Sequence, residues 1–242
     1  MAHHDLHAVF GDHHFPYHDT FCVNESLRVV RRDQPGTIHL LGDVADCYAV
    51  SRHRRDPARV LKFQDEIDQT RDYLKRLRKA APRARIVYLA GNHEDRLIKF
   101  LCDKAPELKN LRALTLGSLL GLALLNIEWI ESSAPYQIGD WWFTHGDAVR
   151  KHAAYTARAK MEQVGANVII GHTHRMGLSC ATTWTGTTVG IENGCLCSLD
   201  CEYVQGTPNW QQGFHLLHWD RKAKTFRPEP CLIRKGSDKC SA

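Results

Sequence analysis

Residues 168–174 read Val168-Ile169-Ile170-Gly171-His172-Thr173-His174, an apolar run that ends in a glycine and two histidines. Three consecutive β-branched apolar residues predict a short buried strand. The histidines stand two positions apart, and in a tight turn after the strand that spacing lets both imidazoles point to one place. Because histidine is the commonest metal ligand, this strand end is a candidate part of a metal site.

Four earlier segments repeat the pattern of an apolar strand followed directly by Asp, Asn or His. They are residues 8–11 before Asp12-His13-His14, residues 38–41 before Gly42-Asp43, residues 86–90 before Gly91-Asn92-His93-Glu94, and residues 141–144 before His145-Gly146-Asp147. Five predicted strands therefore deliver oxygen or imidazole ligands from their carboxyl ends. The pattern predicts a metal centre at the rim of a sheet.

The composition is that of an ordinary globular protein. The chain has 242 residues, 43% of them hydrophobic and 24% charged, which is enough for a sizeable core and suits a single domain over residues 1–242. The net charge of +5 is mildly basic, well short of the dense Lys and Arg stripe that indicates nucleic-acid binding. Nucleic acid is therefore a possible partner that the composition does not itself indicate.

Hydropathy and cysteine usage bear on the cellular compartment. No apolar run approaches the roughly 20 residues that span a bilayer, and no basic segment followed by an apolar one opens the chain, so we expect a cytoplasmic protein without membrane association. Most of the nine cysteines are scattered and fit free thiols in a reducing compartment. Cys195, Cys197 and Cys201 are closer together, and a strand with its turn explains them more readily than a structural zinc site.

Strand and helix patterns alternate along much of the chain. Expected strands cover residues 6–10, 37–41, 86–90, 126–130, 137–144 and 168–170, and expected helices cover 24–32, 57–81, 94–101 and 153–164. This alternation predicts a mostly parallel sheet with crossover helices. Residues 111–125 predict a buried helix or a wedge under the site. Tail strands at 187–192, 214–219 and 225–227 predict a second, antiparallel sheet, and the insert at 180–209 is expected to border the site.

The candidate ligands are carboxylates, an amide and imidazoles, without a required cysteine. Such a set suits Mn, Fe, Zn or Ni and argues against a structural thiolate zinc. There are more candidate ligands than one ion can bind. We therefore expect two divalent ions roughly 3.5–4 Å apart that share a bridging carboxylate. Asp43 is the natural choice for this bridge. Coordination lowers the pKa of water towards about 7, and the hydroxide would attack phosphorus in line.

The five blocks resemble the calcineurin-like metallophosphoesterase superfamily, whose pattern is D-x-H, G-D, G-N-H-[DE], H and G-H-x-H in that order. All five are present in order between Asp12 and His174, and tail residues 192–194 and 213–219 resemble the closing strands of the family. The resemblance implies an α/β fold, a two-sheet β-sandwich flanked by helices in four layers, α/β/β/α. It also implies two divalent ions, with Mn expected first and Fe, Zn or Ni as the other choices.

The resemblance assigns a role to each matching residue. It implies that the first ion is bound by Asp12, His14 and His174, the second by Asn92, His145 and His172, and both by the bridging Asp43. His93 is not a ligand in this scheme, but stabilises the phosphoryl oxygens and protonates the leaving group. Glu94, where the family often has Asp, is expected to orient His93. Asn92 and His93 are therefore also expected substrate contacts.

Residues close to these blocks have competing interpretations. His13 and His18 are expected to be solvated loop histidines, because a metal site fills with few ligands. Asp147 either orients a ligand or caps the helix that follows it. Asp46 either supports a ligand or belongs to a turn.

Two groups of larger side chains flank the same blocks. Trp141 and Trp142 are expected to pack in the core and at its rim, as aromatic residues in strands usually do. Arg52 to Arg55 follow the Asp43 strand closely, and a solvated loop is the plainer interpretation. Because guanidinium forks match phosphate, Arg54 and Arg55 are nevertheless candidate substrate contacts.

We therefore expect a binuclear metallophosphoesterase that hydrolyses phosphate esters with a hydroxide activated by two metals. The chain shows no stretch suited to a large cap domain, so the site should be an open groove that holds both substituents of a phosphodiester, and diesters should be modestly favoured. The main alternative is a phosphomonoesterase acting on proteins or small molecules. A nuclease and a non-catalytic scaffold are further alternatives, and the presence of His93 with every ligand argues against the scaffold.

Overall fold

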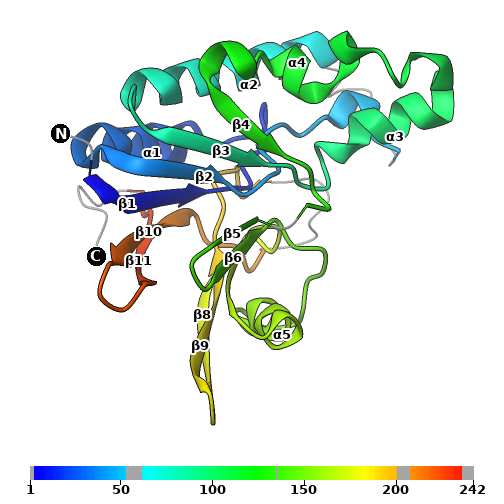
Figure 1. The fold of residues 1–242 in the computed structure, drawn as a ribbon. Helices are drawn as coiled ribbons and strands as arrows, with labels where there is room; N and C mark the ends of the chain where they lie inside the picture. The colour runs from blue at the N-terminus through cyan, green and yellow to red at the C-terminus, as the bar shows by residue number, and fades with distance from the viewer. Residues whose placement is uncertain (1–2, 53–61, 135, 201–207, 236–242) are drawn as a thin grey trace.

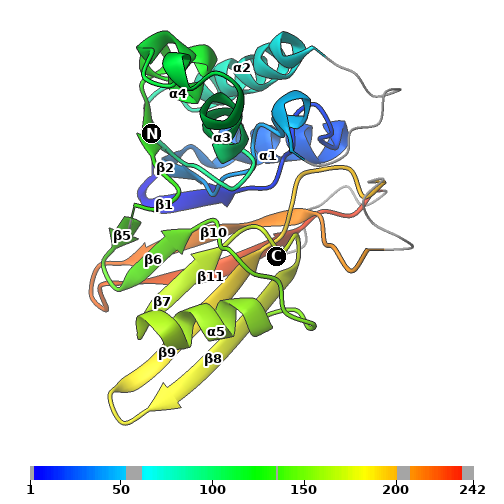
Figure 2. The ribbon, with the colours of Figure 1, turned by 90° about the vertical axis from the view of Figure 1, so that its right-hand side faces the viewer.

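The computed structural model describes residues 3–52, 62–134, 136–200 and 208–235. Two β-sheets pack face to face, and helices cover the outer face of each (Figure 1). Helices α1 to α4 lie over the first sheet, and α5 lies over the second (Figure 2). The chain thus forms the expected two-sheet α/β sandwich in four layers, α/β/β/α.

In the described residues, the first sheet has the strand order β11-β10-β1-β2-β3-β4. Its strands are β1 (His3–Phe10), β2 (Pro35–Leu40), β3 (Arg85–Leu89), β4 (Ile127–Ile130), β10 (Gly213–Asp220) and β11 (Thr225–Leu232). β1 to β4 run parallel, and β10 and β11 form an antiparallel edge. The helices on its outer face are α1 (Thr20–Asp33), α2 (Phe63–Ala80), α3 (Asp95–Lys104) and the short α4 (Leu116–Leu120).

The second sheet has the order β5-β6-β7-β9-β8. Its strands are β5 (Tyr136–Ile138), β6 (Trp141–Thr144), β7 (Asn167–Ile170), β8 (Met176–Thr183) and β9 (Gly186–Asn193). β6, β7 and β9 run parallel, whereas β5 and β8 pair antiparallel at the two edges. Helix α5 (Tyr155–Val164) ends at Gly165, whose left-handed φ of 67° closes the helix as expected from sequence.

Alternate residues of the central strands enter different layers of the core. In β1, Phe10 packs towards the helices while Val9 packs between the sheets. In β7, Ile170 packs against α5 while Ile169 packs between the sheets. Because both faces are covered, such strands are apolar throughout. Their carboxyl ends are consequently held by packing on both sides, which provides a stiff base for functional side chains.

The tail strands differ from expectation. β9 joins the second sheet parallel to β7, while β10 and β11 join the first sheet beside β1. The prediction that the three tail strands form one antiparallel sheet is therefore wrong. The physical reason is that β1 would otherwise present an unpaired edge, and β10 covers it with residues buried on both faces. Strand period alone carries no information about which edge a strand will pair with.

One further segment and the start of one helix also differ. Residues 111–125 form α4 and short 3₁₀ turns packed beside α2, with Leu116 and Leu120 buried and Leu124 90% exposed, so they are not a wedge under the site. Gly121, at a φ of +67°, ends α4 after one turn. The predicted helix over residues 57–81 begins only at Phe63, after the extended Lys62; Pro57, its predicted start, lies outside the described residues.

Within the described residues, the insert at 180–209 begins with a hairpin of β8 and β9 that extends away from the first sheet (Figure 1). The tip of this hairpin carries the fully exposed Trp184. The described part of the insert borders the site, as expected, at Cys195 and Cys197, which lie close to His174. Among the described helices, none has the length and apolar character needed to cross a membrane.

Candidate metal centre

The predicted ligands come from the carboxyl ends of strands in both sheets. Asp12 and His14 follow β1, Asp43 follows β2, and Asn92 follows β3 in the first sheet. In the second sheet, His145 follows β6, and His172 and His174 follow β7. The structure brings all seven side chains together at the seam between the sheets, as the sequence predicted.

The backbone of these turns is unusual. The residues with a positive φ, between 50° and 67°, include Asp12, His14, Asp43, His172 and His174. Residues other than glycine rarely adopt this left-handed conformation, and each instance costs on the order of 1–3 kcal/mol unless the surrounding structure holds it. Such strained residues concentrate at functional sites. Here five of the seven converging donors have this left-handed conformation.

The first donor cluster is formed by Asp12, His14 and His174. The Nε2 atoms of His14 and His174 are 3.1 Å apart, and His174 Nε2 is 3.3 Å from Asp12 Oδ1. Two donors that each lie about 2.0–2.2 Å from one ion are separated by about 3.0–3.5 Å in right-angled or tetrahedral coordination. The cluster therefore has the spacing that a divalent ion requires.

The second cluster is formed by Asn92, His145 and His172. His145 Nε2 is 3.0 Å from Asn92 Oδ1 and 3.2 Å from His172 Nδ1, distances that fit the same coordination. Asp43 Oδ2 lies 3.1 Å from His145 Nε2 and 3.8 Å from His14 Nε2. Asp43 thus stands between the two clusters, where a bridging carboxylate is needed.

Outer partners hold three of the imidazoles in place. His14 Nδ1 donates to Asp46 Oδ2 at 2.9 Å, His145 Nδ1 donates to the Leu41 carbonyl at 2.7 Å, and His174 Nδ1 is 3.7 Å from Cys197 Sγ. A donated Nδ1–H leaves the Nε2 lone pair free for an ion. Asp46 thus supports the His14 ring, which fits the first of its two interpretations if His14 is a ligand.

The electrostatics of the clusters also fit cations. Burial disfavours a charged imidazole, but the carboxylate of Asp43 raises the pKa of His145 to about 10. In the same way, burial is outweighed by Asp12, which raises the pKa of His174 to about 9. The buried carboxylates thus draw positive charge onto their neighbours. Divalent ions would meet that demand and allow the imidazoles to be neutral ligands.

His93 lies beside the two clusters rather than within either triad. Its Nδ1 is 3.1 Å from the Asp46 carbonyl, and its Nε2 is 3.6 Å from Asp43 Oδ2 and 3.0 Å from Arg96 Nη2. Burial acts against protonation, but Asp43 and Asp46 outweigh it and raise the pKa of His93. Arg96, whose Nη1 also donates to Asp46 Oδ1 at 2.9 Å, was not predicted from the sequence. Its only signal was its position one helical turn after His93.

The expected role of Glu94 is wrong. Its buried carboxylate does not contact His93 but accepts hydrogen bonds from the turn that carries Asp43 and from its surroundings. The donors are the backbone N–H groups of Asp43, Val44, Ala45 and Gly91, at 2.8–3.1 Å, and the Tyr88 hydroxyl at 2.6 Å. Gly91 leaves room for this arrangement, because a Cβ there would collide with the Asp43 carboxylate. Glu94 therefore holds the bridging residue.

Three other expectations about nearby residues need correction. His13 is fully buried and bonds to the Tyr73 hydroxyl at 2.9 Å, so it is not solvated. The prediction rested on the composition of the loop, which does not show that His13 and Tyr73 are both buried. His18 is half-buried and stacks on Phe15, with ring centroids 4.1 Å apart. Asp147 is largely exposed and pairs with Lys160 at 3.4 Å, so it neither orients a ligand nor caps α5.

The remaining predicted residues divide between core, rim and undescribed positions. Trp141 is buried and Trp142 is half-buried at a cavity wall, as expected. Cys195 and Cys197 are buried, and each offers a sulfur close to His174. Arg54, Arg55 and Cys201 lie outside the described residues.

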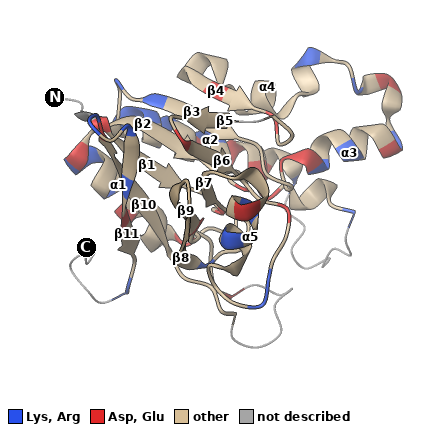
Figure 3. Cartoon of the chain, turned by 60° about the horizontal axis from the view of Figure 1, so that its bottom comes forward, with Lys and Arg blue, Asp and Glu red and all other residues tan. Residues whose placement is uncertain are grey.

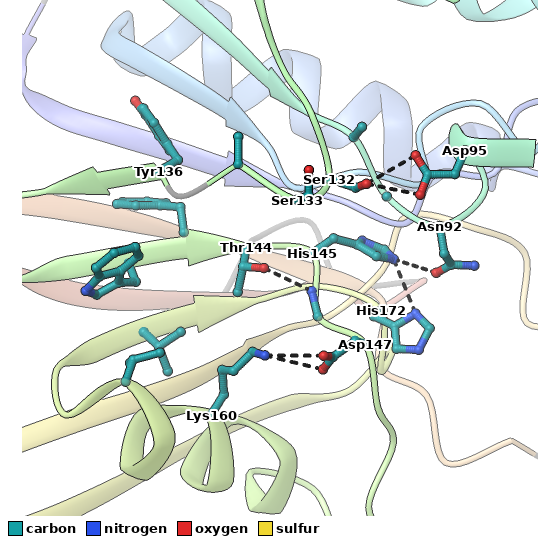
Figure 4. Close-up of a pocket in the computed structure, with 18 residues that line it drawn as sticks. Asn92, Asp95, Ser132, Ser133, Tyr136, Thr144, His145, Asp147, Lys160 and His172 are labelled. Carbon is teal, nitrogen blue, oxygen red and sulfur yellow. Dashed lines mark hydrogen bonds and ion pairs between the residues drawn. The ribbon is translucent and has the colours of Figure 1, made fainter. Parts of the chain in front are cut away.

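A cavity of about 640 Å³ opens beside the second cluster (Figure 4). Asn92, His145 and His172 lie at one end of it, and Asp95 with Ser132 lies on one wall opposite Asp147 with Lys160. The cavity continues past Trp142 and Tyr136. It is large enough for the organic part of a substrate bound at the metal centre.

Comparisons with known proteins agree with this arrangement. Residues 7–176 match the family model described as calcineurin-like phosphoesterase. The chain is 29% identical to the Gene 54 protein of Mycobacterium phage L5 over 95% of this chain and 94% of that protein. It is also 29% identical to the Gene 54 protein of Mycobacterium phage D29, over 88% of each chain.

Solved structures show weaker likenesses. The wild-type Vps29 of Entamoeba histolytica in complex with Zn²⁺ is 14% identical, with a TM-score of 0.47, over 94% of this chain and 98% of that one. The phosphoesterase Yfce of E. coli is 12% identical, with a TM-score of 0.44, over 93% and 98%.

Proposed function

Because the chain belongs to the calcineurin-like phosphoesterase family, we propose that it is a binuclear metallophosphoesterase whose site is built from the seven converging donors. The family supports metal-dependent hydrolysis of phosphate esters. The observation that carries the proposal for this chain is the position of Asp43, which lies between two donor triads of suitable spacing. The proposed ligands are Asp12, His14 and His174 for one ion, Asn92, His145 and His172 for the other, and Asp43 for both.

When bound, two divalent ions supply a nucleophile derived from water and neutralise charge on the phosphoryl group. We propose Mn as the preferred metal, because carboxylate, amide and imidazole ligands suit it; Fe, Zn and Ni fit the same donors. No thiol is required among the proposed ligands. The protein contributes the fixed spacing of the donors, which the strained turns and their outer partners maintain.

The residues around the centre have separate tasks in this proposal. His93, with its raised pKa, would give a proton from Nε2 to the departing oxygen. Arg96 Nη2, which lies 3.0 Å from that nitrogen and can only donate, would have to turn away for Nε2 to carry this proton. The Nδ1–H bond of His93 to the Asp46 carbonyl fixes the ring in that direction. Asn92 turns its oxygen to His145 and its amide nitrogen away (Figure 4), so that the N–H groups remain available to a phosphoryl oxygen.

A modest preference for phosphodiesters is the finer part of the proposal. Asn92 lines two separate recesses, the cavity of about 640 Å³ and a smaller one of about 130 Å³. A phosphorus atom at the centre would therefore have a recess for each of two substituents. The alternative is a phosphomonoesterase that uses the large cavity alone. A nuclease is less favoured, because Lys and Arg are interspersed with Asp and Glu over the described chain (Figure 3).

Turnover of bis-nitrophenyl phosphate and nitrophenyl phosphate with Mn²⁺ tests the proposal. We expect both to be hydrolysed, with kcat/KM for the diester at least equal to that for the monoester. A monoester preference above roughly tenfold, about 1.4 kcal/mol, would exclude the diesterase and leave the hydrolase. Absence of turnover with any of Mn²⁺, Fe²⁺, Zn²⁺ or Ni²⁺ would favour a non-catalytic scaffold.

A further inference from the structure

The smaller recess beside the metal centre is lined largely by cationic side chains. It has a volume of about 130 Å³ and is formed by Val50, Ser51, Arg52, Asn92, Arg96 and Lys99. The cations come from two elements, since Arg52 follows the 3₁₀ turn at Tyr48–Val50 while Arg96 and Lys99 lie on α3. Asn92 connects the recess directly to the second donor cluster.

Two carboxylates oppose these three cations. Arg96 Nη1 is 2.9 Å from Oδ1 of the buried Asp46, and Lys99 Nζ is 3.5 Å from Asp95 Oδ2 in a partly exposed pair. Within the described part of the chain, no hydrogen bond or ion pair engages the Arg52 side chain. The recess therefore retains an excess of positive charge, and Asp46 is shared with His14, which reduces its effect further.

The large cavity has a different charge balance. Its charged residues, apart from the metal-binding histidines, are Asp95, Asp147 and Lys160. Lys160 Nζ lies 3.4 Å from Asp147, and Asp95 is paired with Lys99, so this cavity has no excess of positive charge. An anionic substituent of a bound phosphate ester would therefore be attracted to the recess at Arg52 more strongly than to this cavity.

We propose that the recess at Arg52, Arg96 and Lys99 is a subsite for a second phosphate group, so that the preferred substrates carry one phosphate at the metal centre and another in this recess. The inference rests on the proposed function for the first phosphate. The guanidinium of Arg52, which has no partner among the described residues, can bind phosphate oxygens in a bidentate manner that an ammonium group cannot match. Both Nη atoms of Arg96 already have partners, so Arg96 contributes mainly its charge. Because the recess is partly open to water, we expect a gain in affinity of about tenfold rather than the larger values of enclosed sites.

Non-hydrolysable probes separate this inference from catalysis. Alkane-α,ω-diphosphonates of increasing spacer length, and alkylphosphonates of the same lengths, are titrated calorimetrically into desalted, manganese-loaded protein. We expect one spacer length to bind about tenfold more tightly than its monophosphonate. Arg52→Gln and Lys99→Gln should each reduce that preference to about twofold, the statistical advantage of two equivalent groups. Lys160→Gln, which removes the same charge from the large cavity, should keep it.

Three results would count against the subsite. A preference no larger than about twofold in the unmodified protein overturns it, as does a full preference in Arg52→Gln. Equal loss in Lys160→Gln would mean a general effect of net charge. Turnover of the nitrophenyl esters is measured on the same preparations. Turnover without the diphosphonate preference refutes only the subsite, and the preference without turnover refutes only the hydrolase.

Discussion

Replacement of Glu94 by Gln tests whether this residue holds the Asp43 turn. One carboxylate oxygen accepts from the N–H groups of Asp43 and Gly91, and the other accepts from Val44, Ala45 and Tyr88. The amide group of Gln must present an NH₂ to one of these sets, which leaves at least two buried donors unsatisfied. At about 1–3 kcal/mol for each, the free energy of unfolding should fall by about 3 kcal/mol, and Tm by about 6–12 °C.

The assay compares thermal unfolding of Glu94→Gln with that of Glu128→Gln. Glu128 is a half-exposed glutamate that pairs with Arg85 at 2.7–2.8 Å, and its loss should cost less than about 1 kcal/mol. Glu94→Gln should also bind metal more weakly, because Asp43 loses its support. An unchanged Tm combined with a large fall in kcat would refute this reasoning and restore Glu94 as the residue that orients His93.

Three further predictions concern metal, proton transfer and pH. Asp43→Ala should lose both ions by elemental analysis and Asn92→Ala chiefly the second; two tightly held ions in Asp43→Ala would exclude it as the bridge. His93→Ala should keep its metal yet lose about 10²–10⁴ in kcat on alkyl esters, with a smaller loss on nitrophenyl esters; equal losses would exclude proton donation. Burial lowers the pKa of His7, whose Nδ1 is 2.9 Å from His39 Nε2, to about 4. The unfolded chain protonates His7 near pH 6.5, whereas the folded chain does so only near pH 4. The free energy of unfolding should therefore fall by about 3 kcal/mol as the pH falls from about 6.5 to about 4. Urea unfolding should therefore show a smaller acid loss for His7→Gln than for the unmodified chain, and an identical loss would exclude His7 as the cause.

The seven donors could be located from sequence because their positions follow from strand geometry. Apolar residues that alternate between two covered faces, such as Val9 and Phe10, define parallel strands, and the carboxyl ends of parallel strands meet at one edge. Asp43 and Asn92 occur at those ends in the first sheet, and His145 and His172 occur at them in the second. That the two edges meet does not follow from strand geometry and was implied by the resemblance to the family.

Properties that depend on side-chain direction could not be predicted in this way. Glu94 adjoins His93 in sequence, yet its carboxylate points under the Asp43 turn because several N–H groups there need an acceptor. His13 adjoins two ligands, yet its ring is buried against Tyr73. Strand partners were equally hidden, since β10 pairs with β1 across most of the chain length.

The division of the donors between the sheets has a consequence for folding. Asp12 and Asn92 belong to the first sheet, and His145 and His174 belong to the second, so each ion would act as a cross-link between two halves of the sandwich. Binding that requires the docked sheets stabilises them by mass action, by about 4 kcal/mol at a thousandfold excess over Kd. Metal supply would therefore govern how firmly the sheets stay together, and a cavity at Val9, in the interface between them, would weaken metal binding without touching a ligand.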